Sequence, residues 1–217
     1  MSSDESDEVP GLSAHALAAL QEFYQEQKRE EEKLSEALLG NDDNFQPQED
    51  WQLSQFWYDD RTAEALAKEA LSVVEDHGRI ACVSSPTAYK KICELKKDTV
   101  NVKCFEYDTR FQIYGEDFVF YDYNEPLKID AALKNQFDLV VADPPFLSEE
   151  CLCKTAITIK FLAKDKIILC TGAVMADLAK RLLKVIPCKF EPSHVNRLQN
   201  SFMCYSNYNC KILNLEN

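Results

Sequence analysis

The stretch that decides the fold reads Phe137-Asp138-Leu139-Val140-Val141-Ala142-Asp143-Pro144-Pro145-Phe146. Its apolar run is typical of a strand that is buried on both faces of a parallel sheet. Two prolines then end the hydrogen-bonded ladder, because proline has no N–H to donate. The stretch therefore predicts a buried strand that presents the Asp143 carboxylate and a stiff turn at a sheet edge where ligands bind.

Strand-like and helix-like patterns alternate before and after this stretch. We expect strands over residues 79–83, 100–105, 117–121, 137–142 and 166–170. We expect helices over residues 13–39, 62–74, 86–97, 126–134, 149–162 and 173–185. The last section has strand-like pieces at 188–191 and 201–208 with no helix of useful length between them. The pattern predicts a doubly wound α/β fold, with a mostly parallel sheet that ends in an antiparallel hairpin.

Composition divides the chain of 217 residues into three parts. Residues 1–12 are acidic and polar, so we expect a disordered tail and no secretory signal peptide. We expect residues 13–50 to form an N-terminal helix and a polar linker, and residues 51–217 to form the main domain. The helix either packs on the domain by one short apolar face or binds a partner. The chain has no run of about 18 apolar residues, so we expect no membrane span.

The net charge of −13 is concentrated in the N-terminal part. Residues 1–50 hold 14 acids against 3 bases, which leaves 23 acids against 21 bases, a net charge of −2, in the rest of the chain. Proteins that bind duplex DNA or RNA on their own usually carry a basic surface, because phosphate neutralisation supplies most of the affinity. We therefore expect no stable binding of nucleic acid.

Nine cysteines are scattered from Cys82 to Cys210, an odd number with no CxxC pair. Cys151 and Cys153 form a CxC motif, but no second cysteine pair or histidine cluster stands beside them. We interpret the cysteines as reduced core residues of a cytosolic protein. We expect no metal site.

Three of the expected strands end in an acid, namely Glu106, Asp122 and Asp143. In a doubly wound sheet such strand ends lie along one edge, where ligands bind. Glu106 follows Val83 by 23 residues, close to the spacing of about 20 at which a carboxylate accepts the ribose hydroxyls of an adenosine cofactor. Asp122, one strand further out, could reach an adenine amino group. Acids also end strands simply for solvation, so these three carry weight only as a set.

The turn after the first strand reads Val83-Ser84-Ser85-Pro86-Thr87-Ala88-Tyr89 and contains no glycine. A pyrophosphate-binding site needs glycines so that the backbone can approach the phosphates, which argues against NAD, FAD and ATP. A cofactor without phosphates, such as S-adenosylmethionine, needs carbonyls, hydroxyls and a few amides, and Ser84 and Ser85 could serve it. The aromatic stretch at residues 51–58 is either core or a lid over a flat ligand, with Trp57 as a candidate cofactor contact.

The tip at residues 143–146 suits methyl transfer to nitrogen. Asp143 and the backbone carbonyl of Pro144 can each accept a hydrogen bond from an amine, which directs its lone pair. Phe146 can stack on a base or lie against an alkylammonium group. A lysine, whose unperturbed pKa is about 10.4, must also lose a proton, either to Asp143 or to water. The tip therefore fits an adenine amino group or a lysine side chain, and His194 in the expected final hairpin could lie near the substrate.

The tetrapeptide Asp143-Pro144-Pro145-Phe146 after a buried fourth strand resembles the (D/N)PP(F/Y) signature of amino-group methyltransferases with the seven-stranded S-adenosylmethionine-dependent fold. Further stretches resemble the eukaryotic lysine methyltransferases of translation elongation factor 1-alpha, a family once described as adenine-N6 DNA methyltransferase 2. These stretches are LSAHALAAL (12–20), WQLSQFWY (51–58), FEYD (105–108), FYDYN (120–124), ADPPFLSEEC (142–151) and LCTG (169–172). The resemblance implies a seven-stranded Rossmann-like domain that methylates a lysine of the elongation factor in the cytoplasm, and we expect a monomer.

Three functions stay open to the residues themselves. Besides the lysine methyltransferase, the tip permits an adenine-N6 methyltransferase of DNA or RNA, whose basic surface and target-recognition domain a partner would supply. The glycine-free turn permits a scaffold protein on a decayed methyltransferase fold. For the enzyme, the candidate catalytic residues are Asp143, Pro144 and Phe146. The candidate residues for binding S-adenosylmethionine are Ser84, Ser85, Glu106, Asp122, Asp143 and Trp57.

Overall fold

The computed structural model describes residues 13–39, 47–196, 198 and 200–215. The acidic tail expected over residues 1–12 and most of the expected linker lie outside the described residues. Helix α1 (Ala14–Leu38) belongs to a first unit, and a second, compact unit begins at Pro47. Ser13 caps α1 because its hydroxyl accepts a hydrogen bond from the Ala16 N–H at 3.1 Å.

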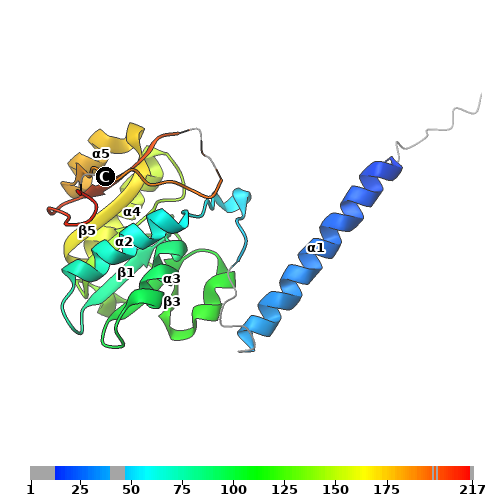
Figure 1. Ribbon diagram of the computed structural model, residues 1–217, viewed down its shortest axis with the longest axis horizontal. Helices are drawn as coiled ribbons and strands as arrows, with labels where there is room; N and C mark the ends of the chain where they lie inside the picture. Colours follow the sequence, from blue (N-terminus) through cyan, green and yellow to red (C-terminus); the bar gives the residue numbers. More distant parts are fainter. Residues whose placement is uncertain (1–12, 40–46, 197, 199, 216–217) are drawn as a thin grey trace, which may run out of the picture. The chain divides into compact units, whose positions relative to one another are not determined.

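Seven strands of the second unit form one sheet in the order β3-β2-β1-β4-β5-β7-β6 (Figure 1). The strands are β1 (Arg79–Val83), β2 (Asn101–Glu106), β3 (Phe118–Phe120), β4 (Phe137–Ala142), β5 (Ala163–Gly172), β6 (Ile186–Pro187) and β7 (Phe202–Ser206). Strands β1 to β5 pair in parallel, whereas β7 runs antiparallel to both β5 and β6. The mostly parallel sheet with an antiparallel end is therefore confirmed. The strand order reverses between β1 and β4, the position at which α/β sheets open a ligand crevice.

Four helices cover the two faces of this sheet (Figure 1). They are α2 (Asp60–Val73), α3 (Pro86–Leu95), α4 (Glu149–Leu162) and α5 (Ala176–Leu183). Successive strand side chains point to opposite faces, so each buried strand contributes to two cores. In β1, Ile80 and Cys82 pack with α2 and α3, while Ala81 and Val83 pack with α4 and α5. Burial on both faces explains why the central strands are apolar throughout.

Short 3₁₀ turns connect several of these elements. They are η1 (Trp51–Leu53), η2 (Thr109–Asp117), η3 (Ala131–Leu133) and η4 (Ala173–Met175). The helix predicted over residues 173–185 is accordingly divided into η4 and α5.

No helix in the described part of the chain is both long enough and apolar enough to cross a membrane.

The helix predicted over residues 126–134 is wrong, since the structure has only the single turn η3 there. Asp130 begins that turn by accepting a hydrogen bond from the Ala132 N–H at 2.9 Å. Such a bond between an aspartate side chain and the nearby backbone favours a turn over a continuous helix. Leu127 is 56% exposed, whereas Ile129 and Leu133 pack against the core that α4 and α5 cover without forming a longer helix.

The strand predicted over residues 188–191 is also misplaced. Strand β6 ends before it, and residues 193–195 pair instead with the segment that precedes α2. The Ser193 carbonyl accepts from the Asp59 N–H at 3.1 Å, and the Val195 N–H donates to the Trp57 carbonyl at 2.9 Å. These partners lie more than 130 residues apart in the chain, so a local sequence pattern does not reveal them.

Candidate active site

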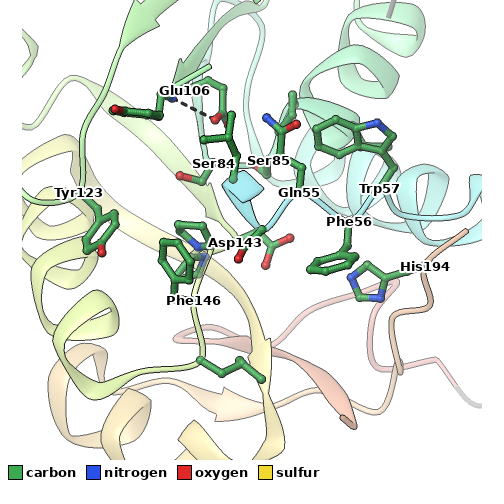
Figure 2. A pocket seen from close by; sticks show the side chains of 18 of the residues that line it. Gln55, Phe56, Trp57, Ser84, Ser85, Glu106, Tyr123, Asp143, Phe146 and His194 are labelled. Atoms are coloured by element: carbon green, nitrogen blue, oxygen red, sulfur yellow. Dashed lines mark hydrogen bonds between the residues drawn. The ribbon is translucent and has the colours of Figure 1, made fainter. Parts of the chain in front are cut away.

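A cavity of about 540 Å³ opens at the carboxyl ends of the central strands (Figure 2). Every residue that the sequence predicted for the site lines this cavity. These residues are Trp57, Ser84, Ser85, Glu106, Asp122, Asp143, Pro144 and Phe146. They come from the ends of β1, β2, β3 and β4 and from the segment before α2, so the sheet edge brings together residues up to 89 positions apart.

Asp143 lies directly after β4, where its N–H donates to the Val83 carbonyl at 3.0 Å and so joins β4 to the end of β1. Its carboxylate Oδ2 accepts a hydrogen bond from the Tyr58 hydroxyl at 2.5 Å. Burial raises the pKa of Asp143 to about 7, the charge of Glu106 acts in the same direction, and the bond from Tyr58 opposes both. A carboxyl group with a pKa near neutrality can hold or release a proton at physiological pH.

Tyr58 is the residue that ties the segment before α2 to this carboxylate. Its side chain is only 4% exposed, and burial raises the pKa of its hydroxyl well above the usual value, so the hydroxyl is a donor at neutral pH. Its ring stacks on His194 with the ring centroids 5.0 Å apart. His194 in turn meets Phe202 edge-on at 4.9 Å. An isolated antiparallel bridge between the backbones of Tyr58 and His194 fixes this contact.

Glu106 ends β2 with its carboxylate almost completely buried at the cavity wall. Its Oε1 accepts hydrogen bonds from the N–H groups of Tyr107 at 3.0 Å and Asp108 at 3.4 Å. Burial raises the pKa of Glu106 to about 7, even though these two bonds favour the charged form. Among the described residues Oε2 has no hydrogen-bond partner in the protein, so it is available to a ligand hydroxyl.

The turn after β1 uses a serine where the backbone is left-handed. Ser84 has φ 51°, a conformation that costs a residue with a Cβ atom roughly 1–2 kcal/mol and that glycine adopts freely. Its N–H donates to the Phe105 carbonyl at 2.8 Å. The Ser85 hydroxyl donates to the Val141 carbonyl at 3.3 Å, which ties the turn to β4. The turn after β1 therefore forms without a glycine. Among the described residues, the Ser84 hydroxyl has no hydrogen-bond partner.

A charged clamp holds the segment before α2 against the end of β2. Asp108 accepts from the Gln55 amide at 2.9 Å and from two nitrogens of Arg110, at 2.9 and 2.7 Å. Arg110 also donates to the Gln55 side-chain oxygen at 3.1 Å. These bonds lower the pKa of Asp108 despite its burial, so the clamp stays charged at neutral pH.

Trp57 is placed at the cavity margin by the same segment. Its indole N–H donates to the Pro47 carbonyl at 3.1 Å, and its ring meets Phe111 edge-on at 5.9 Å. In Figure 2 this indole points away from Asp143, whereas the ring of Phe56 lies beside His194. The contacts of Trp57 thus anchor the segment, and both Trp57 and Phe56 line the cavity.

Phe146 forms an aromatic wall with Tyr123 at the other end of the cavity. The two rings meet edge-on with their centroids 5.8 Å apart, and Phe146 is 39% exposed. The neighbouring Asp122 uses its carboxylate Oδ1 to accept from the Asn124 N–H at 2.8 Å, so this side chain orders the turn after β3. The two rings offer apolar faces that suit a base or an aliphatic chain.

Several residues of the site were not predicted from the sequence. Tyr58 and Gln55 stand inside the quoted aromatic stretch, but nothing in their spacing indicates that they contact Asp143 and Asp108. Tyr123 follows the third strand without a recognisable motif. The structure describes no group of three or more histidine, cysteine, aspartate or glutamate side chains that could hold a metal ion.

Comparison with known proteins gives the family. Residues 49–210 match a family model described as probable N6-adenine methyltransferase. The chain is 53% identical to EEF1A lysine methyltransferase 1 of Homo sapiens over 212 residues, 96% of each chain. It is 37% identical to the protein-lysine N-methyltransferase EFM5 of Saccharomyces cerevisiae over 228 residues, 92% of each chain.

Solved structures match this chain only at much lower identity. A SAM dependent methyltransferase from Aquifex aeolicus aligns with 80% of this chain and 97% of its own at 11% identity and a TM-score of 0.46. The curated relatives, by contrast, match the whole length of the site, from the segment before α2 to the final strands. Since more than half of the aligned residues are identical to EEF1A lysine methyltransferase 1 of Homo sapiens and of Mus musculus over nearly the full length, this chain belongs to the family of EEF1A lysine methyltransferase 1.

Proposed function

We propose that this protein transfers a methyl group from S-adenosylmethionine to a lysine side chain of a protein, and that the substrate is translation elongation factor 1-alpha. The single observation that carries the proposal is the 53% identity, over 96% of both chains, to a protein named EEF1A lysine methyltransferase 1. The Asp-Pro-Pro-Phe tip beside a cavity at the sheet edge supports the reaction type.

The cavity fits the cofactor. Its volume of about 540 Å³ falls within the range of roughly 300–1,000 Å³ that small-molecule sites occupy. Glu106 offers a free carboxylate oxygen for the ribose hydroxyls, and the Ser84 hydroxyl and the turn after β1 offer polar groups without phosphate-binding glycines. S-adenosylmethionine supplies a methyl group on a sulfonium sulfur, which an uncharged amine can attack. Asp122 and Trp57 are the further residues proposed to line the cofactor.

The tip positions the amine. Asp143 Oδ1 and the Pro144 carbonyl each accept a hydrogen bond from the amine, so that the lone pair of the amine is directed at the methyl carbon. The rings of Phe146 and Tyr123 line the path by which the aliphatic chain of a lysine would enter the cavity. The lysine must arrive uncharged, and its proton passes either to Asp143, whose pKa is near 7, or to water.

We further propose that the enzyme acts as a monomer in the cytoplasm and forms no stable complex with nucleic acid. The nearly neutral charge of residues 51–217 supports the last point, because phosphate binding requires basic side chains.

The test uses the full-length protein with S-adenosylmethionine that carries a radioactive methyl group. It is incubated with purified elongation factor 1-alpha and, separately, with a cell extract. The expected label on protein survives nuclease and disappears with protease. Label confined to nucleic acid would refute the proposal and favour adenine methylation. Asp143→Ala serves as the inactive control.

A further inference from the structure

We propose that Tyr58 is the positioning residue of the transfer site: its hydroxyl holds Oδ2 of Asp143 and favours the ionised form of this carboxyl group, so that Oδ1 is free to accept a hydrogen bond from the substrate amine. The inference rests on the function proposed above, in which Asp143 accepts a hydrogen bond from the amine. Tyr58 itself touches neither the amine nor the methyl group in this arrangement.

The geometry of the pair supports a fixed donor. The distance of 2.5 Å between the Tyr58 hydroxyl and Asp143 Oδ2 is at the short end of the range for an O–H···O bond to a charged acceptor. Stacking on His194 and the backbone bridge to the same residue hold the tyrosine ring from the side. A donor whose ring is locked by its neighbours positions its acceptor without an entropic cost at each turnover.

The two oxygens of Asp143 are used differently. Tyr58 is the one side chain among the described residues that donates a hydrogen bond to this carboxylate, and it takes Oδ2. Asp143 lines the cavity, and Figure 2 shows its carboxyl group between Phe146 on one side and Phe56 with His194 on the other. Oδ1 therefore remains for a ligand, which is the atom that the transfer reaction needs.

Among the residues that the structure describes, no positively charged group acts on Asp143 to favour its ionised form. The titratable groups that face the pair from the neighbouring elements are Glu106, Cys151, Cys170, Cys204 and His194. Burial lowers the pKa of His194, which favours its neutral form. Glu106 and burial both favour protonation of Asp143, and the Tyr58 hydroxyl is what opposes them.

The variant Tyr58→Phe removes the hydroxyl and leaves the ring. A hydrogen bond to a charged group corresponds to a pKa difference of about 1–2 units, so the pKa of Asp143 is expected to rise from about 7 to about 8–9. The ionised fraction at pH 7 then falls from about a half to about 1–10%, and methyl transfer falls roughly 5- to 50-fold. Transfer is expected to approach the wild-type rate above pH 9.

The matched control is Tyr89→Phe. Tyr89 is also a buried tyrosine whose hydroxyl donates to an aspartate, Asp117 Oδ2 at 3.2 Å, and it does not line the cavity. Single-turnover transfer is measured from pH 6 to pH 9.5, and each variant is expressed as a ratio to wild type. The ratio cancels the titration of the substrate lysine. We expect a ratio that rises with pH for Tyr58→Phe and a flat ratio near one for Tyr89→Phe.

Two further measurements separate positioning from packing. Calorimetric titration with S-adenosylhomocysteine is expected to give an affinity near wild type for Tyr58→Phe, because the variant keeps the ring and removes only a hydroxyl that is bonded to Asp143. The carboxyl-carbon NMR signal of Asp143 is expected to titrate about 1–2 pH units higher in the variant than in wild type. This signal needs no turnover, so it tests Tyr58 even if wild type methylates no protein and the proposed function fails.

A ratio for Tyr58→Phe that does not change with pH, or a carboxyl signal that titrates as in wild type, would overturn the inference. If Tyr58→Phe does not fold, 3-fluorotyrosine at position 58 replaces it. This analogue keeps the ring and has a more acidic hydroxyl, which is a stronger donor. The titration of Asp143 should then move to lower pH, and an unchanged titration would equally refute the role of Tyr58.

Discussion

Glu69 offers the sharpest test of how this fold is held together. It lies on α2 with its side chain completely buried, and three consecutive N–H groups near the end of the chain donate to its carboxylate. Oε2 accepts from Ile212 at 2.6 Å and from Leu213 at 3.2 Å, and Oε1 accepts from Lys211 at 3.3 Å. The carboxylate therefore fastens the C-terminal segment to the core that α2 and α3 cover, in which Leu213 is buried.

The cost of removing this carboxylate follows from the three bonds. One hydrogen bond to a charged group contributes about 1.5–3 kcal/mol, but the three share one acceptor and do not add fully. Glu69→Ala leaves buried N–H groups without a partner, so we expect it to lower the free energy of unfolding by about 3–5 kcal/mol. Glu69→Gln keeps one acceptor oxygen and should cost about 1–2 kcal/mol.

The assay is urea unfolding of the full-length chain, followed by circular dichroism and tryptophan fluorescence. Glu64→Ala is the matched control, because Glu64 lies on the same helix, about half exposed, and pairs only with Lys68 at 2.7 Å among the contacts described. Exposed pairs of this kind contribute little to stability, because water and salt screen both charges. If Glu69→Ala unfolds within about 1 kcal/mol of wild type with an unchanged urea dependence, the argument for the buried acceptor is refuted.

Three further predictions address the site and its frame. Asp143→Ala should abolish methyl transfer, by at least about 100-fold, while calorimetric titration with S-adenosylhomocysteine stays near wild type; near-normal transfer would contradict the role of the tip. Glu106→Ala should weaken binding of S-adenosylhomocysteine by about 10- to 100-fold with little change in the rate at saturation, since its carboxylate is proposed to hold the ribose; unchanged affinity in the same titration would exclude that role. Gly78→Ala should destabilise the fold by about 1–3 kcal/mol in urea, because an added Cβ would lie 2.8 Å from the Glu75 carbonyl and 2.7 Å from the Val74 Cβ; an undisturbed midpoint would show that the turn before β1 can relax.

The central elements were predictable because local signals and burial agree there. The strand at residues 137–142 and the helix at residues 149–162 have the bounds that the sequence predicted. Ser148 caps that helix by accepting from the Cys151 N–H at 3.2 Å, and two acids follow it in the first turn. Where a sequence contains both the apolar period and the cap, the prediction needs no tertiary information.

Apart from the helix predicted over residues 126–134, where a local turn formed instead, the predictions failed where a distant partner decided the conformation. Residues 188–191 look like a strand, but the chain beyond them pairs with residues 57–59 through Ser193 and Val195. Thr109–Asp117 forms a 3₁₀ segment that the local pattern did not indicate, and its Phe111 packs against Trp57 from the segment before α2. Long-range pairing of this kind has no signature within a short window of sequence.

From the sequence alone it follows that the acids at the ends of the parallel strands and the Asp-Pro-Pro-Phe tip lie together, because a parallel sheet places all such strand ends at one edge. The sequence did not choose between a base and a lysine, and the proposal of a lysine is supported by the names of the relatives. Only the tertiary structure showed that Tyr58 reaches across 85 residues of sequence to Asp143 and that burial brings the pKa of this carboxyl near 7. The physical reason is that a pKa depends on burial and on neighbouring charges, and both are properties of the folded packing rather than of the order of residues.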